Sequence, residues 1–290
     1  MRTFHLADFD RHGFGIAIDR QMFQLRNEQL PHLHDCTEVV CVLRGGGVNS
    51  IDGVNEPLIA GDFYVVPHGS VHQFFSTQGL EFYNLMFNWS LFSAAEMEVL
   101  RSRPGFAAVF ESRGRTGGSV FSDPSGEISR RCGIIAEELD HGGASAALTA
   151  KAALLLLIAA ICDRCSGKNS RVTLGGALED TVMRRILTEL HRDPGTEISV
   201  SKVASRVHLS ATYVNEFFRL RTGIPLIKYR NMFRIAEAGR LLAEDETLPV
   251  SEVSRRCGFA DSGYFSRVFK REAGMTPRRY RQEILRKKNP

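Results

Sequence analysis

The sequence predicts an α+β protein with two domains, an N-terminal domain rich in β-strands and a C-terminal domain built from helices. Short segments rich in Val, Ile, Phe and Tyr, divided by Gly, Pro and Asp turns, occupy about residues 14–90. Towards the C-terminus the pattern becomes helical and contains an internal repeat. We therefore expect domains at residues 1–165 and 179–290, joined by a Gly- and Ser-rich linker at 166–178.

The strand-like segments of the N-terminal domain predict a small β-barrel or β-sandwich. They are GIAIDRQMFQLR, EVVCVLRGGGVNSIDGVNE, DFYVVPHGSVHQFF and LEFYNLMFNW. Two helical segments follow, at about 127–140 and 146–165. The second is apolar around most of its circumference, so we expect it to pack against its own sheet on one side and a second copy of the chain on the other. Burial wholly within one domain is the alternative.

Composition excludes several classes of protein. Hydrophobic residues make up 43% of the chain and charged residues 24%, which is ordinary for a folded soluble protein. The longest apolar run, Ala152–Ile161, is too short to cross a bilayer, and the N-terminal residues lack the apolar core of a secretory signal. The six cysteines form no disulfide framework, and we expect Cys162 and Cys165 to be buried helix residues. We therefore expect a cytoplasmic protein without a membrane partner.

Charge is divided unevenly between the two domains. Residues 1–165 hold 13 Lys and Arg against 19 Asp and Glu, a net charge of −6. Residues 166–290 hold 24 against 14, a net charge of +10. The basic half therefore favours a polyanionic partner.

The internal repeat aligns Val200–Arg230 with Val250–Arg281. The matched residues, at offsets of 50 and then 51, are Val200, Ser201, Val203, Arg206, Tyr213, Phe218, Gly223, Tyr229 and Arg230 in the first copy. Each copy predicts a short helix, a turn and a second helix that ends at a glycine, which is the pattern of a helix-turn-helix. The inward positions are Val203, Val214, Phe217 and Phe218 in one copy and Val253, Phe265, Val268 and Phe269 in the other.

The opposite face of each second helix is polar. It carries Thr212, Asn215, Glu216 and Arg219 in the first copy and Ser262, Ser266, Arg267 and Lys270 in the second. Such a helix in the major groove of double-stranded DNA places Arg or Asn on base edges and Ser, Thr and Lys on phosphates. An amphipathic helix at Leu226–Glu244 joins the copies and would hold them about one DNA turn (~34 Å) apart. A generic helical bundle with solvated faces is the alternative.

Residues of about 179–286 resemble the DNA-binding domain of the AraC/XylS family of transcription regulators. The resemblance rests on the turn Ser254-Arg255-Arg256-Cys257-Gly258-Phe259 and the following YFSRVFKREAGMTPRRYR. It implies base-facing positions at Thr212, Asn215 and Glu216 in the first copy and at Ser262, Gly263, Ser266 and Arg267 in the second. It also implies activation of transcription by contact with RNA polymerase, and the apolar helical segment at 146–165 adds the expectation of a homodimer.

The N-terminal domain contains a His-x-His-x3-Glu pattern formed by His32, His34 and Glu38, and a later Gly-x5-Pro-x-Gly-x2-His pattern that ends at His72. Both resemble the motifs of cupin barrels, which implies a cupin-like effector domain. His32 and His34 alternate on one strand and so face the interior together. With Glu38, and with His72 on a facing strand, they form a set suited to a divalent metal as cofactor.

An effector site without metal is the other interpretation of these residues. In it, His34, Glu38 and His72 are polar anchors among Phe63, Tyr64, Phe74 and Phe82, and the effector is a sugar or a related small molecule. We therefore expect a non-enzymatic, effector-responsive DNA-binding activator. Two alternatives stay open, a metal-dependent cupin enzyme fused to a DNA-binding tail and a constitutive repressor or architectural protein.

Overall fold

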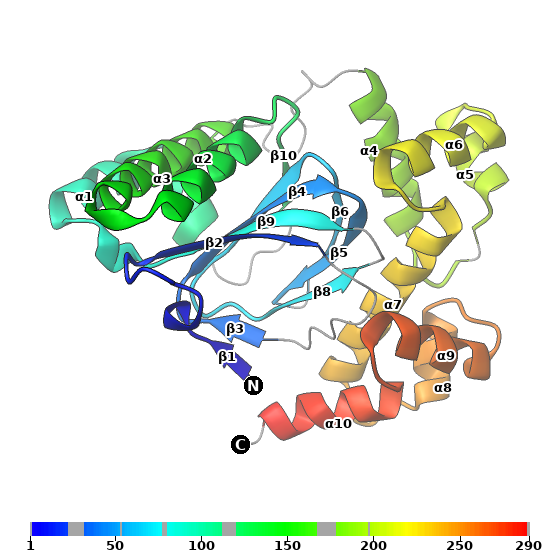
Figure 1. Ribbon diagram of the computed structural model, residues 1–290. Coiled ribbons are helices and arrows are strands. Elements are labelled where there is room, and N and C mark those ends of the chain that lie inside the picture. The colour runs from blue at the N-terminus through cyan, green and yellow to red at the C-terminus, as the bar shows by residue number, and fades with distance from the viewer. Residues whose placement is uncertain are drawn as a thin grey trace.

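The computed structural model describes residues 2–22, 32–52, 54–76, 80–111, 120–166, 178–196 and 198–288. Apart from its two end residues, Ser166 and Leu178, the expected linker lies outside these residues. The chain is organised in layers, with helices on both sides of a central pair of sheets (Figure 1).

The described strands form two five-stranded sheets. Sheet A has the order β1 (Arg2–Phe4), β3 (His32–His34), β8 (His72–Ser76), β5 (Gly46–Ile51), β6 (Val54–Ile59). Sheet B has the order β10 (Val120–Ser122), β7 (Asp62–Val66), β4 (Thr37–Arg44), β9 (Glu81–Phe87), β2 (Ile16–Met22). Neighbouring strands are antiparallel except for β1 and β3. The described strands therefore form two separate sheets, and no ladder among them closes a barrel.

The inner faces of the two sheets enclose one apolar cluster. Alternate residues of each strand point into it because side chains alternate along a strand with a period of two. Sheet B contributes Val40, Val42, Tyr64, Val66 and Phe82, and sheet A contributes Ile51, Leu58 and Phe74. Polar residues at neighbouring inward positions of this layer form the candidate ligand site described below.

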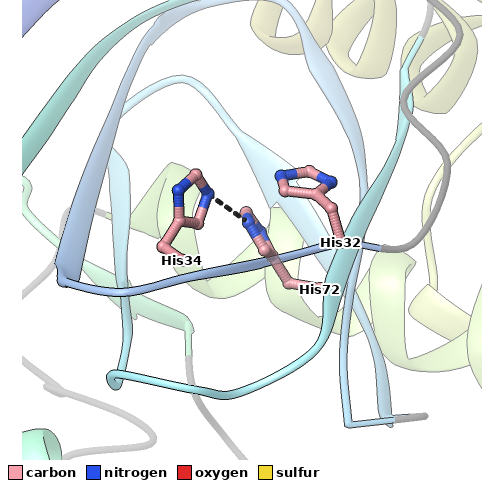
Figure 2. A group of neighbouring side chains, drawn as sticks. All are labelled: His32, His34 and His72. Atoms are coloured by element: carbon pink, nitrogen blue, oxygen red, sulfur yellow. Dashed lines mark hydrogen bonds between the residues drawn. The ribbon is translucent and has the colours of Figure 1, made fainter. Parts of the chain in front are cut away.

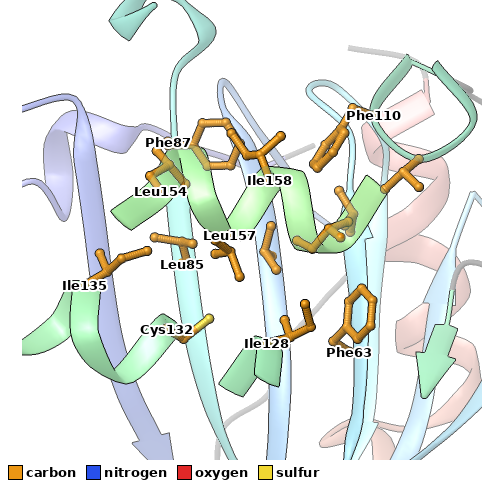
Figure 3. Packing of buried hydrophobic residues seen from close by; sticks show 14 of the residues in the cluster. Phe63, Leu85, Phe87, Phe110, Ile128, Cys132, Ile135, Leu154, Leu157 and Ile158 are labelled. Atoms are coloured by element: carbon orange, nitrogen blue, oxygen red, sulfur yellow. The ribbon is translucent and has the colours of Figure 1, made fainter. Parts of the chain in front are cut away.

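Two antiparallel helices, α2 (Glu127–His141) and α3 (Gly143–Cys165), cover the outer face of sheet B (Figure 1). Figure 3 shows α3 lying over the sheet, with Leu154, Leu157 and Ile158 packed against Leu85 and Phe87. Shorter elements border this layer: η2 (Trp89–Leu91), α1 (Ala94–Ser102) and η3 (Ala107–Glu111); η1 (Leu6–Asp8) lies elsewhere, with Leu6 packed against Ala17, Cys36 and Met86. The two long helices were expected from the sequence, whereas the short elements were not.

One side of α3 stays outside the core. The segment Ser145–Cys165 is long and apolar enough to cross a membrane by length and composition alone, with a mean hydropathy of 2.1. The core helix of a soluble protein meets the same criteria, and Leu154 and Ile158 on the sheet side are fully buried. On the opposite side Leu148 is 71% exposed and Leu156 is 57% exposed.

The C-terminal part contains only helices among its described residues. They are α4 (Leu178–His191), α5 (Val200–Val207), α6 (Ala211–Thr222), α7 (Leu226–Glu244), α8 (Val250–Arg256), α9 (Ser262–Ala273) and α10 (Pro277–Lys288). We call α4–α6 the first unit and α8–α10 the second unit. The central helix α7 belongs to both, because Leu226 and Met232 lie in the core of the first unit and Phe233 and Leu242 in that of the second.

In each unit, an arginine from the internal repeat donates hydrogen bonds to backbone carbonyls near the start of the helix pair. Arg230 is 2% exposed and donates to the backbone carbonyls of Leu190, in the last turn of α4, and of Asp193 and Thr196 in the loop that follows. Its repeat counterpart, Arg281, donates to the carbonyls of the loop after α7. The matched arginines therefore hold the segment that leads into the first helix of each helix pair.

The helical part rests on the outer face of sheet A, with α7 running beside its strands (Figure 1). Val48 on β5 is fully buried in the core of the second unit, and Ile59 on β6 packs against the core of the first. The buried hydroxyl of Tyr280 on α10 donates to Gln73 Oε1 on β8 at 2.7 Å. Sheet A is thus in direct contact with both units.

The six cysteines are buried and unpaired by disulfides. Cys162 and Cys165 are buried residues of α3, as expected. The sulfur atoms of Cys41 on β4 and Cys132 on α2 lie 3.4 Å apart, in the layer between sheet B and its helices.

Candidate DNA interface and ligand site

The helices α6 and α9 begin and end in the same way, as the repeat predicts. Ser210 caps α6 by accepting a hydrogen bond from the backbone N–H of Tyr213, and Asp261 caps α9 by accepting one from that of Tyr264. Both helices end at a glycine in the left-handed conformation, with φ of 75° at Gly223 and 76° in its counterpart. The two helices therefore present equivalent residues at equivalent positions.

The residues expected to face DNA lie on the open side of these helices. Asn215 and Ser266 are half-buried. The others are exposed: Thr212, Glu216, Arg219, Ser262, Gly263, Arg267 and Lys270. The inward positions expected from the repeat are all buried, Phe217 being the most accessible of them at 8%. The polar faces of α6 and α9 are thus available to a partner.

Two exposed tyrosines on this surface were not among the expected site residues. Tyr213 is 46% exposed on α6 and its counterpart Tyr264 is 45% exposed on α9. The guanidinium of Arg267 lies 6.0 Å from the centre of the Tyr264 ring. The sequence did contain a signal for these residues, because the two tyrosines match each other in the internal repeat. A match in the repeat does not, however, show whether a residue lies in the core or on the surface.

The turns between the helices of each pair differ in one residue type. His208 ends α5 in the left-handed conformation with a φ of 60°, and Gly258 occupies the same position in the second unit with a φ of 76°. A Cβ on Gly258 would lie 2.7 Å from the carbonyl oxygen of Pro194 and 2.8 Å from that of Gly195. Glycine is therefore required in the second turn both by its backbone angle and by this contact with the first unit.

The inward polar cluster is formed by His32, His34, His72 and Glu38, each at most 5% exposed. Figure 2 shows the three imidazoles grouped in the interior, with a hydrogen bond of 3.0 Å between His34 Nε2 and His72 Nε2. One ligand atom from each of the three histidines lies within 4.8 Å of the others. Glu38 Oε2 lies 3.2 Å from His72 Nε2 and 3.7 Å from His34 Nε2.

Burial keeps the charge of this cluster low. It lowers the pKa of His34 to about 4, with repulsion from His32 as the second cause, and it also lowers the pKa of His72. Burial raises the pKa of Glu38 to about 8, against the opposing effect of a hydrogen bond from Asn84. Neutral imidazoles are the form in which histidine binds a metal.

The positions of two expected site residues need correction. His72 does not lie on a strand facing His32 but pairs with it in the same sheet, and Glu38 comes from the opposite sheet. The chain bends between β3 and β4, so that consecutive strands enter different sheets. Phe63 points to the outer face beneath α2 and α3, because its neighbour Tyr64 points inward. Phe74 and Phe82 face the interior as expected.

One further inward polar residue, Asn49, was missed by sequence reasoning, whereas Tyr64 was expected at the site. Both side-chain polar atoms of Asn49 and the hydroxyl of Tyr64 are buried and have no hydrogen-bond partner within the described part of the chain. A buried unsatisfied polar group costs about 1–3 kcal/mol, so such groups indicate a water or ligand partner. An Asn in a strand pattern carries no signal of this kind, because its lack of partners arises only in the packed structure.

The chain is similar to known regulators over most of its length. A helix-turn-helix domain family model matches residues 203–283. The HTH-type transcriptional activator RhaR of Enterobacter sp. (strain 638) is 27% identical over 251 residues, 86% of each chain. RhaR of Cronobacter sakazakii is 26% identical over 260 residues, 87% of this chain and 86% of that one.

Among solved structures, the C-terminal domain of AraT, a response regulator from Geobacillus stearothermophilus, is 25% identical. It covers 37% of this chain and 88% of its own, with a TM-score of 0.35. The sequence matches, together with the repeated helix pairs and their exposed polar faces, identify the chain as a DNA-binding transcription regulator that is similar to those of the AraC/XylS family.

Proposed function

We propose that the pairs α5–α6 and α8–α9 are two helix-turn-helix units, with α6 and α9 as recognition helices in consecutive major grooves of double-stranded DNA. The observation that carries this proposal is the equivalence of two exposed polar helix faces within a segment of net charge +10. The 19 residues of α7 span about 28 Å at the usual helical rise, which is close to one DNA turn (~34 Å).

The side chains suggest a division of roles on DNA. Asn215 and Arg267 suit adenine and guanine edges, and Glu216 suits the amino group of cytosine. Contacts to phosphates or to further bases are assigned to Thr212, Arg219, Ser262, Ser266 and Lys270. Gly263 carries no side chain, so it permits close approach of the backbone without reading a base.

The test begins with duplexes selected by the full chain from a random library. Fluorescence anisotropy then compares a selected duplex with a random one. Binding should weaken steeply with salt, and Arg267→Ala should weaken the selected duplex by about 1–3 kcal/mol more than the random one. Arg255→Ala, on the exposed side of α8 where it pairs with Glu252, is the control and should affect both duplexes equally. Equal losses for Arg267→Ala would remove it from base recognition.

For the N-terminal domain, residues 1–165, we propose a cupin-like effector domain that binds a small polar metabolite such as a sugar. Its expected contacts are His34, Glu38, His72 and Phe74, and the unsatisfied groups of Asn49 and Tyr64 support a polar ligand. A thermal-shift screen of the full chain against sugars, sugar acids and aromatic acids tests this. A hit should raise the melting temperature of the parent protein and leave that of His72→Ala unchanged.

We also propose that the exposed side of α3 joins two copies of the chain. Leu148 and Leu156 are large apolar residues on that side, two turns apart. Sedimentation should give a dimer that Leu156→Glu dissociates. Val99→Glu, which changes an equally exposed residue on α1, should leave it intact. A monomeric parent protein would contradict this interface.

We propose that the regulator acts in the cytoplasm as an activator that contacts RNA polymerase and that it binds its effector without converting it. The names of its relatives as transcription activators support this role. A metal-dependent enzyme with a DNA-binding tail is the second candidate, which the histidine cluster favours. In vitro transcription from a promoter carrying the selected duplex tests activation. Metal-dependent turnover of a compound from the thermal-shift screen would favour the enzyme.

A further inference from the structure

The helix α9 carries an exposed arginine without a polar partner. Arg267 forms no hydrogen bond or ion pair among the described residues. The exposed arginines of the neighbouring helix α8 differ from it, because Arg255 and Arg256 both pair with Glu252. The five N–H donors of the Arg267 guanidinium are therefore not used within the described part of the chain, and a partner outside the chain can engage them.

Two other residues of α9 define where this guanidinium lies. Gly263 and Tyr264 precede Arg267 by four and three residues, so all three lie on one side of the helix. The Arg267 guanidinium carbon is 6.0 Å from the centre of the Tyr264 ring, at the outer end of the range of a cation–π contact. A Cβ on Gly263 would lie 3.7 Å from Nη1 of Arg267. The arginine side chain therefore runs back along α9, over Gly263 and beside the Tyr264 ring.

The Tyr264 ring is itself held in place. Its backbone N–H donates to the side chain of Asp261, which caps the helix. Its ring is tilted against that of Phe259, with ring centres 6.2 Å apart. Phe259 is 6% exposed and belongs to the core of the second unit. Tyr264 therefore connects the mobile end of an exposed arginine to a packed part of the protein.

The first unit lacks this arrangement although it has the same tyrosine. The counterparts of Gly263, Tyr264 and Arg267 are Thr212, Tyr213 and Glu216. The ring of Tyr213 stacks on Phe217 instead, with ring centres 5.6 Å apart and planes 8° apart. The face of an aromatic ring attracts a cation and not an anion. The glycine and the arginine thus occur together in one copy of the repeat and are replaced together in the other.

We propose that Tyr264 is a positioning residue, which holds the Arg267 guanidinium over Gly263 in the orientation that binds the edge of a guanine in the major groove. This inference rests on the function proposed above and adds a specificity-determining role for Tyr264. A long side chain loses conformational entropy when it is ordered on DNA. A guanidinium that already packs against a ring has lost part of that entropy before binding, which favours the correct base.

The test uses fluorescence anisotropy with the full chain and compares the Kd for the random duplex with that for the selected duplex. The ratio of the two values measures specificity. Tyr264→Leu should lower this ratio about two- to fivefold, the size of an exposed cation–π contact. Tyr264→Phe keeps the ring and should retain the parent ratio. Gly263→Thr, which copies the first unit, should lower the ratio because the added side chain displaces the guanidinium.

Tyr213 supplies the matched control, because it is equally exposed but has no arginine beside its ring. Tyr213→Leu should change the Kd for both duplexes by the same factor. Far-UV circular dichroism of each variant confirms folding. The double variant Tyr264→Leu/Arg267→Ala should be no less specific than Arg267→Ala alone, since Tyr264 acts through Arg267. A further loss of specificity in the double variant overturns the positioning role.

Two other outcomes separate this inference from the proposed function. If Arg267→Ala lowers the ratio and Tyr264→Leu leaves it unchanged, base recognition by Arg267 stands and the role of Tyr264 is overturned. If Arg267→Ala weakens both duplexes equally, base recognition by Arg267 and the role of Tyr264 are both overturned.

Discussion

The second turn offers a sharp test of how the two units fit together. Gly258→Ala places a Cβ 2.7 Å from the carbonyl oxygen of Pro194 and 2.8 Å from that of Gly195, and it forces a left-handed backbone on alanine. The backbone angle alone costs about 1 kcal/mol. Relief of the contact displaces the loop whose carbonyls at Pro194 and Thr196 accept hydrogen bonds from Arg234, both at 3.0 Å. Each such bond contributes about 1 kcal/mol, so we expect a total loss of about 2–4 kcal/mol.

Equilibrium unfolding of the full chain in urea measures this loss, and the first unit supplies the matched comparison. His208 occupies the equivalent position with a φ of 60°, so His208→Gly relieves strain and should stabilise the protein by about 0.5–1 kcal/mol. Opposite signs for the two substitutions are the expected result. A Gly258→Ala protein within 0.5 kcal/mol of the parent would refute both the close contact and the left-handed turn.

Two further predictions concern the first unit. Arg230→Met removes the donor to the carbonyls of Leu190 at the end of α4 and of Asp193 in the following loop, and urea unfolding should show a loss of about 3–5 kcal/mol. Arg281→Met, at the half-buried counterpart, should lose less, and equal losses would contradict the difference in burial. Burial lowers the pKa of His191 to about 3, so the folded state binds fewer protons than the unfolded state, whose pKa is near 6.5. Stability should therefore fall as pH drops below 6.5, by up to about 2 kcal/mol at pH 5 from this group. His191→Gln should flatten the pH profile by that amount, and an unchanged slope would show that the imidazole titrates normally.

The helical part was largely predictable because its signals are local and occur twice. The amphipathic pattern predicted α7 at Leu226–Glu244, and the repeat predicted Phe217 and Phe218 as core residues, all of which the structure confirms. Cap and glycine positions follow from a few neighbouring residues, so a single sequence suffices for them.

The ligand site was less predictable because it depends on contacts between distant strands. Alternation correctly placed His32 and His34 on the interior face, but it could not show that His72 pairs beside His32. The pattern of β5 also leaves open what covers the outer face of sheet A, where Val48 enters the core of the second unit. Such pairings depend on packing between strands that are distant in the sequence, and the alternation of side chains along a single strand gives no information about them.

Since α7 contributes residues to both unit cores, its length fixes the phase between α6 and α9. Insertion of a single residue in its middle would rotate the second unit by about 100° and shift it by about 1.5 Å. Substitutions on the polar faces of α6 and α9 leave that phase untouched. In the proposed mode of binding, sequence preference can therefore change by ordinary point mutation, whereas the spacing between the two DNA elements is locked to the length of one helix.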